Sequence, residues 1–242
     1  LLFCSQFSKG APNIIIILTD DLGWGDVSYN GGPISTPNID KLSNNGVQMN
    51  RFYSAPTCSP TRAALLTGIN SLAVGVIRPI DNPTADRYGL PLKYKIMPQF
   101  FKDAGYQTAL SGKWHLGMFS DEYLPRNRGF DSTYGHLGGG IGYFDHAVAG
   151  RMDWHRNGEI LYEDGYSTTL IADEAIRIIK NKSEESPLFL YIAFNAPHTP
   201  IEAEENIIKE LGFIENEKEL SLIHISEPTR RRGISYAVFC LK

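Results

Sequence analysis

The chain has 242 residues, of which 42% are hydrophobic and 21% are charged, and its formal net charge at pH 7 is −4. This composition is typical of a globular protein, and the length suffices for one domain with a sizeable core. The balance of 23 basic against 27 acidic residues excludes the broad positive surface of a nucleic-acid-binding protein. No apolar run approaches the roughly 20 residues of a transmembrane helix, so we expect no membrane span.

The first half of the chain begins with a β-branched apolar run, NIIIILTDD at Asn13 to Asp21, which ends in two carboxylates. Such a run is typical of a strand buried on both faces of an α/β sheet. Ser35 to Gly46 carries a capping hydroxyl, an early proline and a final glycine, which predict a short helix. VQMNRFYSA at Val47 to Ala55 predicts a second strand, and TRAALLTG after Pro60 predicts a helix that ends at Gly68.

Later segments continue the alternation of helices and strands. We predict an amphipathic helix at Lys95 to Gly105, a strand from Tyr106 that ends at Gly112, a long functional loop at Arg126 to His146, a helix at Thr168 to Lys182 and a buried strand within Pro187 to Pro200. This order predicts an α/β fold with a mainly parallel sheet covered by helices on both faces.

Polar side chains follow three of the predicted strands. Asp20 and Asp21 close the first, Lys113 and His115 follow Gly112, and His198 follows the last. Because ligands of such sheets bind outside the carboxyl ends of the strands, we expect these groups to meet in one crevice.

Each of these groups has a functional and a structural interpretation. Paired carboxylates at a buried strand end suit a hard divalent ion, although an isolated Asp-Asp is more often a helix cap or a solvated turn. Lys113 and His115 suit a fixed cation beside a titratable base, or else a surface turn. A single loop histidine such as His198 is usually structural.

Cys58 lies at the start of a predicted helix, with Arg62 one turn further along. Unpaired amides, the helix dipole and the guanidinium favour an anion there, which would suit a thiolate nucleophile. The four-residue spacing is shorter than in the phosphate loop of cysteine phosphatases, and an inert buried thiol is the common alternative. Cys4, Cys58 and Cys240 are too few and too far apart for a disulfide framework.

Five segments resemble sulfatases in the same order along the chain. CSPTR at Cys58 to Arg62 resembles the signature C-x-P-x-R, and GKWHLG at Gly112 to Gly117 resembles the second sulfatase signature. The segments at 13–27, 126–146 and 196–200 also match. The similarity is closest to the arylsulfatase B group, the N-acetylgalactosamine-4-sulfatases with their arylsulfatase I and J relatives, and it implies the alkaline phosphatase-like sulfatase fold.

The resemblance assigns a role to each candidate residue. Cys58 would be oxidised to formylglycine by the formylglycine-generating enzyme, which recognises Pro60 and Arg62. The hydrate of this formylglycine would attack sulfur and later expel sulfate. Asp20, Asp21 and the modified Cys58 would bind one Ca²⁺. Arg62 would hold the hydrate, Lys113 would bridge it to the sulfate, His115 would take the proton that triggers elimination, and His198 would contact the sulfate and its leaving oxygen.

The resemblance also implies partners and a location. A sulfated sugar or aryl sulfate would be the substrate, in a lysosome or outside the cell. The apolar start within residues 1–10 suits either a signal-peptide remnant or an arbitrary fragment edge, and Asn181-Lys182-Ser183 is a glycosylation triplet.

The resemblance stops near residue 220. The family completes its calcium site with an Asp-Asn pair and a lysine further along, and neither can be placed here. We therefore expect residues 11–220 to be the N-terminal part of a catalytic domain and residues 221–242 to be unrelated sequence, with a sheet left incomplete and open at one edge. We therefore expect this chain to have low or no sulfatase activity. The alternatives are a phosphonate or phosphodiester hydrolase of the same superfamily and a non-catalytic fragment.

Overall fold

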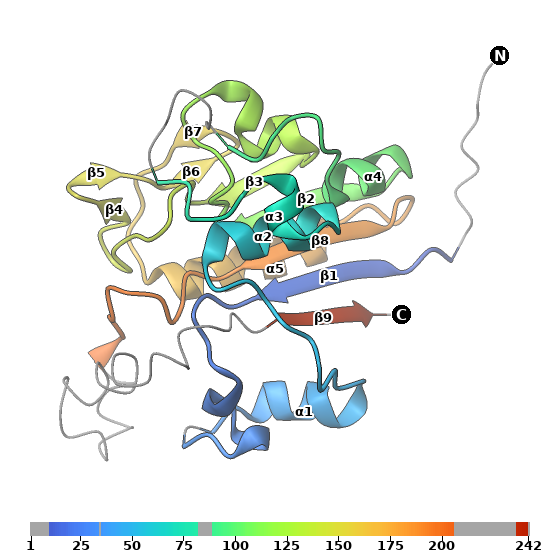
Figure 1. Ribbon diagram of the computed structural model, residues 1–242, viewed down its shortest axis with the longest axis vertical. Coiled ribbons are helices and arrows are strands. Elements are labelled where there is room, and N and C mark those ends of the chain that lie inside the picture. The colour runs from blue at the N-terminus through green and yellow to red at the C-terminus, as the bar shows by residue number, and fades with distance from the viewer. Residues whose placement is uncertain (1–9, 34, 82–88, 206–235, 242) are drawn as a thin grey trace.

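The computed structural model describes residues 10–33, 35–81, 89–205 and 236–241. Within them, seven strands form one sheet in the order β7-β6-β3-β2-β8-β1-β9 (Figure 1). Its strands are β1 (Asn13–Leu18), β2 (Gln107–Gly112), β3 (Ser132–Gly135), β6 (His155–Arg156), β7 (Glu159–Ile160), β8 (Leu188–Ala193) and β9 (Tyr236–Leu241), and a separate hairpin pairs β4 (Ala147–Val148) with β5 (Arg151–Met152).

Five α-helices and four short 3₁₀ helices connect the described strands. They are α1 (Pro37–Asn45), α2 (Cys58–Thr67), α3 (Ser71–Val74), α4 (Met97–Asp103), α5 (Ser167–Asn181), η1 (Trp24–Asp26), η2 (Ser28–Asn30), η3 (Asp121–Tyr123) and η4 (Pro125–Arg128). The described residues contain no helix that is both long and apolar enough to cross a bilayer.

The centre of the sheet is parallel, as the sequence predicts. β3, β2, β8 and β1 run in the same direction, and β6, β7 and β9 add antiparallel strands at the two sides. Alternate residues of β8 face opposite cores: Phe189 and Tyr191 join the cluster that includes α2 and α3, whereas Leu190 joins the cluster that includes α5. Helices therefore cover both faces of the sheet, and the predicted fold class is confirmed.

The carboxyl ends of β1, β2 and β8 meet at one edge of the sheet. Leu18 and Gly112 both pair with Ala193, the last residue of β8. The Lys113 amide donates to the Ala193 carbonyl over 2.7 Å, and the Asp20 amide donates to the Ala196 carbonyl over 3.0 Å. The residues that follow these strands therefore start from one place, which positions the candidate site.

Two predicted segments differ from the structure. Residues 47–55 form no strand, and several of their large apolar side chains are exposed, among them Val47 at 90% and Tyr53 at 83%. The alternating pattern there predicted a strand, but no neighbouring strand offers it a hydrogen-bonding partner. The predicted long loop at 126–146 contains most of η4 and all of β3, and Gly135 of β3 passes so close to β2 that a Cβ atom would lie 2.4 Å from the Gly112 oxygen.

One outer strand of the sheet comes from residues 221–242, which were expected to be unrelated to the family. This strand, β9, pairs antiparallel with β1, with Ile16 opposite Val238. β9 is therefore the outer strand at this side of the sheet, beyond β1 (Figure 1).

Candidate active site

Asp20 lies at the centre of a buried charge cluster. Its side chain has no solvent exposure, and one carboxylate oxygen accepts a hydrogen bond from Lys113. The other oxygen, Oδ1, lies 3.6 Å from the Arg62 guanidinium and accepts no hydrogen bond within the described part of the chain. Two positive charges therefore surround one negative charge, all three without solvent exposure.

Helix α2 and the end of β2 place the two cations. Arg62 is fully buried and donates to the Lys113 carbonyl over 2.9 Å and to the Tyr191 hydroxyl over 3.2 Å. Lys113 also donates to the Gly139 carbonyl. Gly112, which precedes it, has φ 114° and passes so close to β8 that a Cβ atom would lie 1.9 Å from the Ala193 oxygen. Only glycine fits there, so the strand ends and Lys113 turns toward Asp20.

Cys58 and His115 form the reactive pair of the site. Cys58 is the first residue of α2 and is 6% exposed, and its Sγ lies 3.1 Å from His115 Nδ1. His115 has φ 55°, so the strand geometry does not continue through it. Its other ring nitrogen, Nε2, lies 3.0 Å from Asp81 Oδ1. Ser59 donates to the His115 carbonyl over 2.8 Å and thereby ties the helix start to this turn.

Burial and charge set the protonation states of these groups. Burial opposes the charged form of Asp20, but Lys113, Arg62 and His198 outweigh it and lower the pKa of this carboxyl to about 2. Burial lowers the pKa of His115 to about 4; Lys113 and Arg62 add to this effect, and the hydrogen bond with the Asp81 carboxylate opposes it. Burial raises the pKa of the Cys58 thiol. At neutral pH the cluster therefore holds an ionised Asp20, a neutral imidazole and a protonated thiol.

His198 and Asp21 lie at the more exposed side of the site. Asp21 has φ 66°, and its carboxylate lies 3.8 Å from His198 Nε2. The side chains are 26% exposed for His198 and 46% exposed for Asp21. Tyr143 donates to the His198 carbonyl over 2.8 Å and holds this segment in place.

A glycine-rich loop, residues 138–142, lies over His115 and His198. A Cβ atom on Gly139 would lie 2.8 Å from His115 Cε1, and one on Gly140 would lie 3.1 Å from His198 Cε1. Asp153 fixes the loop by accepting from the amides of Leu137 and Gly138 over 3.0 and 2.7 Å. These glycines therefore allow the backbone to approach both histidines closely.

The structure brings the predicted residues together from separate elements. Asp20, Arg62 and Lys113 contact one another, Cys58 contacts His115, and His198 forms a third pair with Asp21. Three groups were missed: Asp81, Tyr191 and the Gly139 carbonyl. Asp81 follows no strand and belongs to no signature, so its place beside His115 had no sequence signal.

The described residues do not by themselves fit a calcium ion. The buried Asp20 Oδ1 is one oxygen without a hydrogen bond, and Asp21 offers a second carboxylate. Calcium takes 6 to 8 oxygen ligands. Within the described ranges, no group of three or more His, Cys, Asp or Glu side chains could hold a metal ion. Ligation by Asp20, Asp21 and Cys58 therefore stays a prediction.

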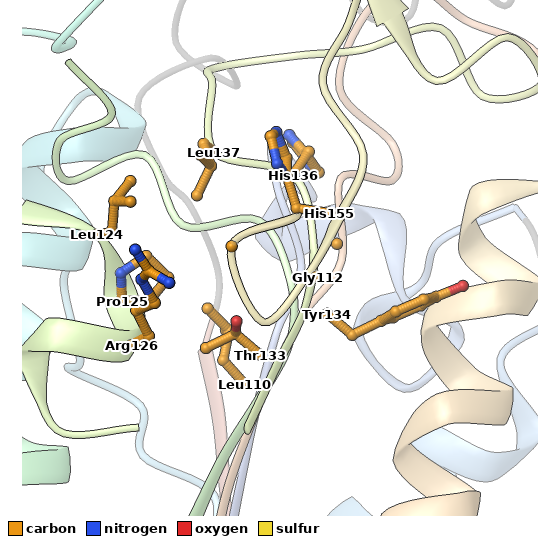
Figure 2. A pocket seen from close by; sticks show the side chains of 12 residues that line it. Leu110, Gly112, Leu124, Pro125, Arg126, Thr133, Tyr134, His136, Leu137 and His155 are labelled. Carbon is orange, nitrogen blue, oxygen red and sulfur yellow. The ribbon is translucent and has the colours of Figure 1, made fainter. Parts of the chain in front are cut away.

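A small cavity is lined in part by Gly112, the residue that precedes Lys113 (Figure 2). His136 lines it together with His155 and Thr133, and none of the predicted catalytic residues does. His136 is 1% exposed, and neither of its ring nitrogens has a hydrogen-bond partner in the described part of the protein. Burial lowers its pKa to about 3, so the ring is a neutral neighbour of the charge cluster.

Comparison with known proteins places this geometry in a family. The family model described as Sulfatase matches residues 12–220. The chain belongs to the sulfatase family. It is 37% identical to arylsulfatase J of Mus musculus over 201 residues, which cover 79% of this chain and 33% of that protein.

Solved sulfatase-family structures share the fold. The crystal structure of Ps i-CgsB matches with a TM-score of 0.79 and 33% identity, over 92% of this chain and 53% of that one. A protein solved with its substrate D-glucosamine-2-N,6-O-disulfate matches with a TM-score of 0.68 and 30% identity, over 86% of this chain and 38% of that one. The sulfatase chain thus spans between one third and about half of the length of these relatives.

Proposed function

We propose that this site hydrolyses sulfate esters and that Cys58 is converted to formylglycine to do so. The observation that carries the proposal is the position of the Cys58 side chain: it lies at the start of α2, 3.1 Å from His115 Nδ1, beside a buried cluster that contains Arg62 and Lys113. A side chain at this point has a base within hydrogen-bond reach and two cations nearby, which is the arrangement an oxygen nucleophile needs.

The charge of the buried cluster favours an anionic substrate. Lys113 and Arg62 together carry two positive charges, and Asp20 carries one negative charge, so one positive charge is left over. Buried charges that lack a counter-charge are costly, so a singly charged ligand in this position is stabilised. A sulfate monoester carries one negative charge, whereas a phosphate monoester carries more.

Each residue then has a specific task. A formylglycine hydrate at position 58 would supply one hydroxyl to attack sulfur and a second hydroxyl whose deprotonation releases sulfate. His115, whose ring is neutral at neutral pH, has Nδ1 3.1 Å from the Cys58 side chain and would take the proton from that position. Lys113 and Arg62 stabilise negative charge on the sulfate oxygens, and His198 lies at the open side, where the leaving alcohol would be protonated.

The proposal extends to calcium, substrate and location. Asp20, Asp21 and the modified Cys58 would contribute to a Ca²⁺ site, for which the described residues supply only part of the ligands. Sulfated sugars or aryl sulfates would be the substrates, which agrees with the sulfated glucosamine bound by one structural relative. The formylglycine-generating enzyme would place the protein in the secretory pathway, with a lysosomal or extracellular destination, and Asn181 is exposed at the end of α5, as a glycosylated asparagine must be.

An ester-selectivity assay tests the proposal. The chain is expressed with the formylglycine-generating enzyme and incubated, in excess over substrate, with an aryl sulfate, an aryl phosphate and a bis-aryl phosphodiester. We expect slow release from the sulfate only, with none from the Cys58→Ala variant. Preference for the phosphodiester would favour the alternative hydrolase, and release equal to that of Cys58→Ala would favour a non-catalytic fragment. Robust turnover would contradict the expected impairment of this chain.

A further inference from the structure

His115 is held through both nitrogens of its ring. Nδ1 lies 3.1 Å from Cys58 Sγ, and Nε2 lies 3.0 Å from Asp81 Oδ1. The imidazole is almost fully buried, with 2% of its side chain exposed, whereas 59% of the Asp81 side chain is exposed. Asp81 therefore reaches from the surface to a buried ring that already faces the reactive position.

The hydrogen-bond partners of His115 determine which of its ring nitrogens carries the hydrogen. An ionised carboxylate only accepts hydrogen bonds, so Nε2 must carry the hydrogen that Asp81 accepts. A neutral imidazole has one N–H, which leaves a lone pair on Nδ1. With the hydrogen on Nε2, the Nδ1 lone pair lies 3.1 Å from Cys58 Sγ, within reach of a hydrogen bond from the thiol.

The glycine-rich loop holds the same pair from the other side. A Cβ atom on Gly139 would lie 2.8 Å from His115 Cε1, 2.9 Å from His115 Nε2 and 3.0 Å from Asp81 Oδ1. The backbone at Gly139 therefore packs over the hydrogen bond itself and leaves the ring little room to rotate. Its carbonyl also accepts from Lys113, so the loop couples this pair to the charge cluster.

We propose that Asp81 is a positioning residue: its carboxylate fixes the tautomer and the orientation of His115 so that the Nδ1 lone pair faces the side chain at position 58. In the unmodified chain this lone pair accepts from the thiol. In the modified chain it would face the hydroxyl whose proton His115 removes, so the catalytic consequence rests on the proposed function. The placement of the ring does not rest on it.

Nuclear magnetic resonance of the unmodified chain tests the placement directly. Histidine labelled with ¹⁵N in the ring shows which nitrogen carries the hydrogen, and His115→Gln assigns the signal. We expect a downfield, slowly exchanging Nε2–H in the wild type, its loss in Asp81→Ala and its partial recovery in Asp81→Asn, whose amide oxygen still accepts. Asp103→Ala, which removes another largely exposed carboxylate, should leave the signal unchanged.

Either of two results would overturn the proposal: a hydrogen on Nδ1 in the wild type, or an unchanged Nε2–H signal in Asp81→Ala. In the modified chain, Asp81→Ala should lower kcat by about tenfold or more with little change in KM, because a misplaced base slows proton transfer without weakening binding. A wild type without turnover would count against the proposed function alone, since the resonance still decides the role of Asp81.

Discussion

At the scale of single residues, Asp20 is the group on which the buried charges depend. It is the counter-charge of both Lys113 and Arg62, and none of the three side chains is exposed. Asp20→Ala would leave two buried cations without their partner, so we expect the free energy of unfolding to fall by about 3–5 kcal/mol. Urea unfolding at pH 7 measures this loss.

An exposed ion pair provides the matched control. Asp103→Ala removes the partner of Lys95 at the surface, where both side chains are solvated. This change should cost less than about 1 kcal/mol, because exposed pairs contribute little. Equal losses for the two variants would show that the Asp20 cluster is not a buried, mutually dependent unit.

His136 predicts a pH dependence of stability. Burial, Lys113 and Arg62 lower the pKa of its ring to about 3, whereas Asp153 and Asp20 act in the opposite direction. In the unfolded chain the ring binds a proton below its ordinary pKa of 6.5, but the folded protein keeps it neutral down to about pH 3. The stability from this group is therefore complete above pH 6.5 and is lost as the pH falls toward 3.

Removing the ring tests that prediction. His136→Leu should reduce the difference in unfolding free energy between pH 7 and pH 5 by about 2 kcal/mol. The remaining difference includes His115, whose pKa is also lowered by burial, while Asp20 stays ionised throughout this range. An unchanged difference between the two pH values would mean that His136 is protonated in the folded protein.

At the scale of elements, the glycine-rich loop determines how closely backbone approaches the histidines. Gly139→Ala would place a methyl group 2.8 Å from His115 Cε1, so either the loop or the ring must move. We expect a loss of about 1–3 kcal/mol in unfolding free energy, as for other overpacked sites. Gly25→Ala is the control, because nothing lies within 4 Å of the added atom. If both substitutions had the same effect, the close approach at Gly139 would be refuted.

The strands show how much of the fold the sequence could predict. The apolar runs before Asp20 and His198 and the strand that stops at Gly112 located three strand ends, because buried parallel strands leave a clear local pattern. Residues 47–55 have an alternating pattern that predicted a strand, but they form none. Strand pairing depends on a neighbouring strand, which the local sequence does not encode.

The candidate site divides in the same way. Signature residues such as Cys58 and His115 carry a recognisable spacing, and their meeting follows from the parallel sheet. Asp81 reaches His115 from a segment with no regular structure, and Tyr191 was counted only as part of a strand. Contacts of this kind depend on three-dimensional packing and have no local signal.

At the scale of the whole molecule, the described site lacks enough ligands for a calcium ion. Within the described ranges, Asp20 and Asp21 offer carboxylates but no three candidate ligands meet. We therefore expect millimolar Ca²⁺ to raise the unfolding temperature of this chain by little, because stabilisation requires a ligand concentration well above Kd. A large calcium-dependent increase that disappears in Asp20→Asn would show that the chain already completes the site.

The proposed sulfatase activity depends on the chemical fate of one side chain. Cys58 is buried against His115 beside Lys113 and Arg62, which suits a precursor of an oxygen nucleophile. The direct measurement is mass spectrometry of the peptide that contains Cys58, after expression with and without the formylglycine-generating enzyme. We predict an aldehyde at position 58 that depends on this enzyme and is lost in Arg62→Ala. An intact thiol in cells that convert a control sulfatase would contradict the account.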